Sequence, residues 1–139
     1  MTDLSKVSGE SLSKVIAEFL GWKFEMRTFN LYAEDDIVPT PQEVGPFWWP
    51  PGSGCNAPSL PDMVNDPAMT VMLMEKISAD GRDFSYEWDH PPGDEPRLFF
   101  CISPRFDEPG YGATSYVAHG NLGRAVAEAF VIANKLEVR

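Results

Sequence analysis

The chain has 139 residues, of which 43% are hydrophobic and 23% charged, a composition typical of one soluble globular domain. Its 21 acidic and 11 basic residues give a formal net charge of −10, which argues against duplex nucleic acid and anionic membranes as partners because both repel an acidic protein. The longest apolar run, Leu98–Ile102, is too short to span a membrane.

The N-terminal residues and the cysteines indicate the compartment. The first four residues, MTDL, have neither the basic nor the apolar region of a signal peptide, so we expect no secretion. The two cysteines, Cys55 and Cys101, are too few for a disulfide framework or a metal cluster. We therefore predict a protein of the cytoplasm, inside a host cell if it comes from a phage, with no metal or other cofactor.

The first predicted elements are a helix and a strand. Over residues 8–20, Leu12, Ile16 and Phe19 recur at helical spacing and form one apolar stripe, and Ser8 is placed to cap the first turn. Residues 22–26 (WKFEM) alternate between apolar and polar, which predicts a strand with one buried face.

A segment rich in proline and tryptophan follows. Residues 39–58 contain six of the chain's thirteen prolines and the pair Trp48-Trp49. Because proline fixes φ and lacks an N–H donor, the segment suits neither a helix interior nor a central strand. We predict a long loop over residues 38–61, ordered by its tryptophans, and expect a binding site there.

The second half of the chain predicts two helices and three strands. Asp66 and Pro67 are the cap and first residue of a helix that runs to about Ala79, and Asn121 caps a last helix that ends near Leu136. Between them lie strands at residues 83–89, 97–103 and 113–118. The first alternates, with Phe84, Tyr86 and Trp88 on one face, whereas Leu98–Ile102 is continuously apolar and is expected to be buried on both faces.

This order of elements predicts an α+β fold. Residues 84–102 form a hairpin, and no regular alternation of strand and helix is present, so the sheet is expected to be mainly antiparallel. Three helices divided over the two faces of a sheet of about four strands would bury all the apolar stripes. The predicted architecture is a three-layer α-β-α sandwich in a single domain, residues 1–139.

Three segments of the chain resemble the phage ABA sandwich domain family of small phage and prophage proteins. They are Val15–Trp22 (VIAEFLGW), Pro58–Pro61 leading into the helix Asp66–Ile77, and the alanine-rich Leu122–Ala129. The resemblance implies a phage origin and an α-β-α fold. It implies no catalytic residues, since most members of the family have no assigned function.

No arrangement of residues indicates catalysis. The two histidines, His90 and His119, adjoin turn residues, and the sequence contains no HxxxH, HExxH, CxxC or GxSxG pattern. The glycine pairs at 52–54 and 110–112 do not form a phosphate-binding loop, because neither follows a strand and opens directly into a helix with a lysine. We therefore predict a protein that is not an enzyme.

Aromatic and basic side chains in the predicted loops are the candidate binding residues. Such residues stack on planar ligands and pair with phosphates, and they are equally the anchors of protein interfaces. An alternative left open is that the tryptophans only pack their loop onto the sheet. The candidates are Trp48, Trp49, Arg97, Arg105 and Tyr111.

Two functions follow from these features. The first is a small phage accessory protein that binds and inhibits a host or defence-system protein, which would be an anti-defence function. The alternative is a sponge that sequesters a nucleotide-type immune signal in a pocket lined by the aromatic and arginine side chains. Both hypotheses allow a homodimer.

Overall fold

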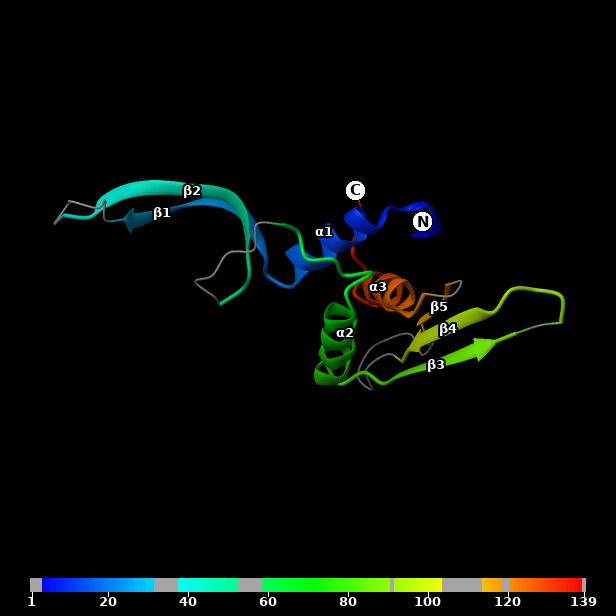
Figure 1. Cartoon of the computed structure of the whole chain (residues 1–139). Helices are drawn as coiled ribbons and strands as arrows, with labels where there is room; N and C mark the ends of the chain where they lie inside the picture. The colour runs from blue at the N-terminus through cyan, green and yellow to red at the C-terminus, as the bar shows by residue number, and fades with distance from the viewer. Residues whose placement is uncertain are drawn as a thin grey trace. The chain divides into compact units, whose positions relative to one another are not determined.

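The computed structural model of the protein describes residues 4–31, 38–52, 59–90, 92–103, 114–118 and 121–138. These residues form an α+β fold (Figure 1). Its α-helices are α1 (Gly9–Phe19), α2 (Pro67–Ala79) and α3 (Leu122–Ala133), preceded by the short 3-10 helix η1 (Leu4–Lys6). Its strands are β1 (Lys23–Leu31), β2 (Thr40–Trp49), β3 (Phe84–Asp89), β4 (Arg97–Ile102) and β5 (Thr114–Ala118). The α+β class and the three helices predicted from the sequence are therefore confirmed.

The chain divides into two compact units. A helical unit comprises Met1–Ile16 and Pro61–Arg139, and a hairpin unit comprises Ala17–Leu60. Helix α1 begins in the helical unit, and its last residues belong to the hairpin unit. The single-domain organisation stays a prediction.

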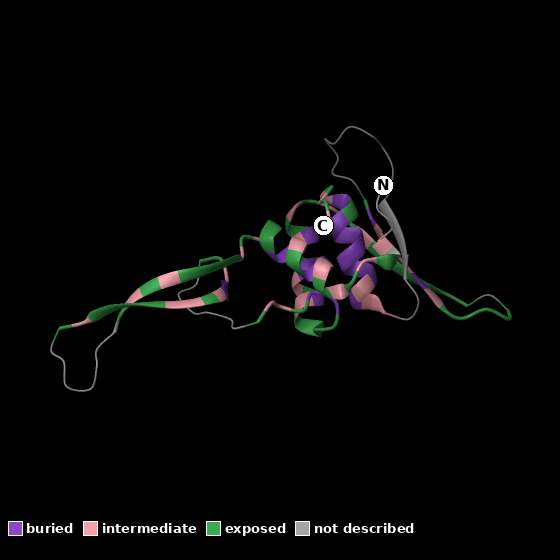
Figure 2. Ribbon diagram, turned by 90° about the horizontal axis from the view of Figure 1, so that it is seen from above, coloured by how far each residue is buried: buried purple, intermediate pink, exposed green. Residues whose placement is uncertain are grey.

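The core of the helical unit surrounds α3. This helix is buried on nearly every side, because its alanines and Gly123 let neighbouring elements approach closely, and it packs against α2, β4 and β5. Figure 2 shows that the buried residues concentrate in the helices. The largest fully buried apolar side chains of the unit are Leu12, Ile16, Met63, Leu73, Ile77, Leu98, Phe100, Ile102, Val126 and Phe130.

The three predicted helix caps are present, and at α1 Ser8 Oγ accepts a hydrogen bond from the backbone N–H of Ser11 at 3.1 Å. The Asp66 carboxylate accepts a hydrogen bond from the backbone N–H of Ala68 at 3.0 Å, and Pro67 is the first residue of α2. The Asn121 side chain accepts one from the N–H of Arg124 at 3.0 Å. These bonds satisfy donors that the first turn of a helix otherwise leaves without a partner.

The sheet of the helical unit has three antiparallel strands in the order β3-β4-β5. The residues of β4 alternate, with Leu98, Phe100 and Ile102 fully buried and the residues between them half-buried. The predicted burial of Leu98–Ile102 on both faces therefore holds fully for one face and only in part for the other. An apolar run does not reveal how completely each face of a strand is covered.

The hairpin unit overturns part of the predicted loop at 38–61. Residues 40–49 form β2, which pairs antiparallel with β1, and β1 extends to Leu31, well beyond the strand predicted at 22–26. Only Pro41 and Pro46 lie inside β2. A strand of a two-stranded sheet has one free edge, where a missing N–H costs no ladder bond.

Pro46 also adjoins an irregularity in the pairing. The register shifts between Glu25 and Arg27, opposite Gly45 and Pro46, and the Gly45-Pro46 peptide is cis. Gly45 has a φ of +122°, and a Cβ there would lie 2.9 Å from the backbone nitrogen of Phe47. Only glycine fits this backbone position.

The strands thus form two sheets, β1-β2 and β3-β4-β5, where one sheet was predicted. Two sheets form because β1 pairs with the proline-rich segment instead of joining the other strands. The prolines of that segment had predicted a loop, not a strand. The three-layer sandwich is accordingly not confirmed. Among the described residues, no helix is both long and apolar enough to cross a membrane.

Candidate functional site

Trp49 packs inside the hairpin unit. Its side chain is 2% exposed, and its indole Nε1–H donates a hydrogen bond to the backbone carbonyl of Glu25 at 2.8 Å. The rings of Phe29 and Phe47 have their centroids 5.7 and 6.3 Å from its own. Trp49 therefore joins the two strands of the hairpin through both its apolar ring and its one donor.

Arg27 completes this aromatic cluster. Its guanidinium carbon lies 4.5 Å from the centroid of the Trp49 ring, and its Nε–H donates to the Glu25 carboxylate at 3.2 Å. Trp48 is 8% exposed, and its ring centroid lies 5.3 Å from that of Phe24. Trp49 thus packs against Phe29, Phe47 and Arg27, and Trp48 against Phe24, all within the same hairpin. The role of the two tryptophans in binding stays a prediction.

The other predicted site residues belong to the helical unit. Arg97 is the first residue of β4, its Nη2 lies 4.0 Å from a carboxylate oxygen of Asp94, and its Nε is buried with no hydrogen-bond partner among the described residues. Arg105 and Tyr111 lie outside the described residues. The structure therefore does not show the predicted aromatic and arginine side chains together.

Two further aromatic side chains, Tyr86 and Trp88, which the alternating sequence places on one face of a strand, are exposed on β3. Tyr86 and Trp88 are each 54% exposed. The strand register places them opposite Phe100 and Leu98 of β4, which are fully buried. Side chains directly opposite each other share a face of the sheet. Tyr86 and Trp88 hence lie on the same face of the sheet as the buried residues of β4, but on the neighbouring strand, where that face is exposed to solvent.

The outer edge of β3 is open in the described structure. Among the residues described, β3 pairs only with β4. The backbone N–H of Ser103 donates to the carbonyl of Asp83 at 2.8 Å, so 83 and 103 form a hydrogen-bonded pair of the ladder. Because such pairs alternate in antiparallel sheets, the N–H and C=O groups of Tyr86 and Trp88 point away from β4.

The opposite face of β3 is polar and acidic. Ser85, Glu87 and Asp89 are all exposed and alternate with the aromatic residues. The segment 82–97, which contains β3 and the turn into β4, carries five acidic and two basic residues. The two strands run out past α2 and α3 toward that turn (Figure 1). The hairpin thus presents an aromatic face, an acidic face and a free backbone edge.

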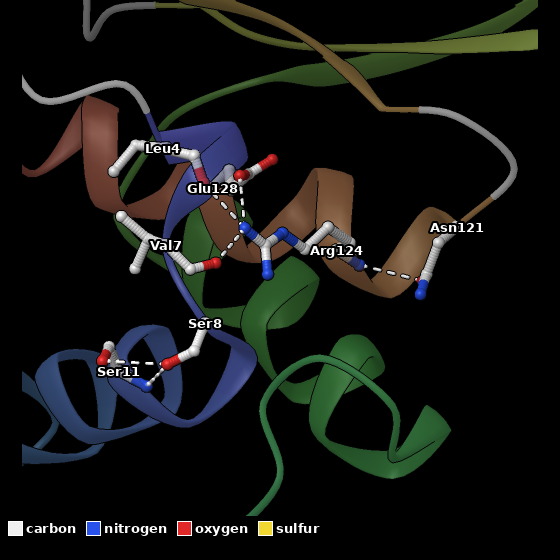
Figure 3. Close-up of polar contacts among 7 residues, drawn as sticks. All are labelled: Leu4, Val7, Ser8, Ser11, Asn121, Arg124 and Glu128. Carbon is white, nitrogen blue, oxygen red and sulfur yellow. Dashed lines mark hydrogen bonds and ion pairs between the residues drawn. The ribbon is translucent and has the colours of Figure 1, made fainter.

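The polar cluster with the deepest burial lies elsewhere, on α3. Arg124 Nη2 donates to the backbone carbonyls of Leu4 and Val7 at 2.7 and 2.6 Å, and to Glu128 Oε1 at 3.0 Å (Figure 3). Glu128 is fully buried. These bonds attach the N-terminal residues to α3, so we assign the cluster a role in stabilising the fold.

The described residues include no group of three or more His, Cys, Asp and Glu side chains arranged to hold a metal ion. His90 is exposed directly after β3. A search of protein-family models, of characterised proteins and of solved structures finds no match to this chain. Membership of the phage ABA sandwich domain family stays a prediction.

Proposed function

We propose that this chain is a small non-enzymatic protein that acts by binding another protein through β3. In the phage setting that the family resemblance implies, it works in the host cytoplasm, and its partner is a host or defence-system protein that it inhibits. The observation that carries the proposal is the exposure of Tyr86 and Trp88, each 54%, beside a strand edge that no described residue pairs with.

Exposed aromatic side chains of this kind support an interface. Tryptophan and tyrosine are enriched among the residues that contribute most to binding energy. Trp48 and Trp49 are buried, whereas more than half of Trp88 remains in contact with water. A partner that covers Trp88 would remove this apolar surface from water, which stabilises a complex by about 25 cal/mol for each Å² buried.

The sponge hypothesis has less support. It needs a pocket lined by aromatic and arginine side chains, between protomers or under the proline-rich segment, and no arrangement among the described residues favours one. The net charge of −10 also repels an anionic nucleotide. The sponge therefore stays the second hypothesis, and the experiment described next would also detect a bound small molecule.

The test is affinity purification of the tagged chain from host cells, followed by native mass spectrometry. The unmodified chain is expected to retain one stoichiometric protein, and the double variant Tyr86→Ala, Trp88→Ala to lose it. Phe24→Ala is the matched control, because Phe24 is 56% exposed but lies on β1. The same spectra report whether the chain is a homodimer.

Retention of the partner by the double variant would refute binding through β3. Recovery of a bound small molecule in place of a protein would support the sponge.

A further inference from the structure

We propose that the partner binds by strand addition: an extended segment with alternating basic and apolar residues pairs antiparallel with the outer edge of β3. This inference rests on the proposed function and specifies the chemistry of the partner. It is carried by three features of β3 that coincide over residues 84–89, namely its open edge, its aromatic face and its acidic face.

The open edge supplies the backbone bonds. In the described structure the N–H and C=O groups of Tyr86 and Trp88 point away from β4, as the Asp83–Ser103 hydrogen bond determines. An added antiparallel strand would satisfy these groups with its own N–H and C=O groups. Main-chain bonding of this kind gives affinity, and pockets for alternate side chains give specificity.

The two faces of β3 determine the side chains of the added strand. Residues opposite Tyr86 and Trp88 would lie on the face that β4 buries with Leu98 and Phe100, so they should be apolar. Residues that alternate with them would lie beside Glu87 and Asp89, where opposite charge stabilises neighbouring strands. Lysine or arginine at every second position meets this requirement.

A second copy of this chain is a poor occupant of the same edge. Antiparallel pairing of β3 with β3 centred on Glu87 or Trp88 would place carboxylates of the two copies directly opposite each other. Like charges opposite each other destabilise a strand pair. Both chains would also carry a net charge of −10. Charge complementarity therefore favours a basic partner.

The probe is a synthetic peptide, Lys-Val-Lys-Val-Lys-Val-Lys, whose binding to the full chain is measured by fluorescence anisotropy. In the antiparallel geometry the valines face Tyr86 and Trp88, so the valine N–H groups bond to β3 and the lysine N–H groups point outward. N-methylation of the valine nitrogens should abolish binding. N-methylation of the inner lysine nitrogens should leave it within about twofold, because these nitrogens bond to nothing on β3.

A second experiment reverses the charge of the acidic face of β3. The variant Glu87→Lys, Asp89→Lys should bind the lysine peptide about tenfold more weakly, since it replaces attraction by repulsion at neighbouring positions. The same variant should bind the peptide Glu-Val-Glu-Val-Glu-Val-Glu more tightly than the unmodified chain does. That gain also shows that the variant is folded.

Loss of binding with both N-methylated peptides, or with neither, would overturn strand addition. Equal affinity of the charge-reversed variant for the two peptides would overturn the basic partner. If these results occur while Tyr86→Ala, Trp88→Ala still loses its cellular partner, the proposed function stands and only strand addition fails.

Discussion

Arg124 and Glu128, one turn apart on α3, form an ion pair of 3.0 Å in which the carboxylate is fully buried. The same guanidinium nitrogen of Arg124 also donates to the carbonyls of Leu4 and Val7. One arginine therefore both balances a buried charge and attaches the N-terminal residues to α3. A buried ion pair contributes little over an apolar pair, but removing one member is costly.

Replacing Arg124 by methionine should strongly destabilise the helical unit. The change removes the cation beside the buried Glu128 carboxylate and leaves two carbonyls without their donor, for an expected loss of about 3–5 kcal/mol. Urea unfolding followed by circular dichroism measures it. The double variant Arg124→Met, Glu128→Leu should recover part of the loss. A loss for the single variant of under about 1 kcal/mol would show that the ion pair is dispensable.

Replacing Gly123 by alanine should also destabilise the fold. A Cβ at Gly123 would collide with the backbone carbonyl oxygen of Val64 and lie 3.0 Å from Thr70 Oγ1. Because backbone must shift to admit it, we expect a loss of about 1–3 kcal/mol. Gly9→Ala is the matched control, since its Cβ would meet Val64 at 3.7 Å, an ordinary contact. Equal stabilities of the two variants in thermal unfolding would contradict this close approach.

The stability of the helical unit should fall in acid partly through Asp62. Its carboxylate accepts hydrogen bonds from the backbone N–H groups of Asn65 and Val64, at 2.9 and 3.0 Å. The Asn65 N–H lowers the pKa of Asp62 below its ordinary value of 3.8, burial opposes this shift, and the Val64 N–H and the Asn65 side-chain amide lower the pKa further. A carboxyl whose pKa is lower in the folded state contributes stability above its unfolded pKa. This contribution is lost as the pH falls through the folded pKa.

Asp62→Asn tests this contribution. Asparagine keeps an acceptor oxygen but cannot titrate, so the variant should lose less stability than the unmodified chain between neutral pH and the acid limb. Unfolding free energies measured across that range compare the two slopes, and nuclear magnetic resonance titration of the Asp62 side chain gives its pKa directly. If the unfolding free energies of the two proteins fall equally with decreasing pH, Asp62 does not contribute to the loss of stability in acid.

The tryptophans should differ in their access to a fluorescence quencher. Trp88 is 54% exposed, whereas Trp48 and Trp49 are 8% and 2% exposed. Replacing Trp88 by phenylalanine should therefore lower the acrylamide quenching constant of the remaining emission. Trp48→Phe should raise it, because a protected emitter is removed. Identical quenching constants for the two variants would contradict the burial that the structure assigns to them.

Local features of the sequence determined the helices and their ends. The caps Asp66 and Asn121 and the apolar stripe of α1 depend on residues within a few positions of one another, so their physics is contained in short segments. The alternation in β3 was also recognised correctly. Its aromatic residues do share one face, opposite the buried residues of β4.

The tertiary structure alone decided which aromatic residues are exposed and which strands pair. Trp49 is covered because β1 brings Phe29 and Arg27 to it, whereas Trp88 extends a buried face into solvent. The proline-rich segment forms β2 because its partner β1 leaves it a free edge. Gly123 is required because Val64, distant in sequence, approaches its backbone. Contacts between residues far apart in the chain leave no local pattern, so the sequence determined the helices and the strands β3 to β5, whereas packing determined β2 and the candidate site.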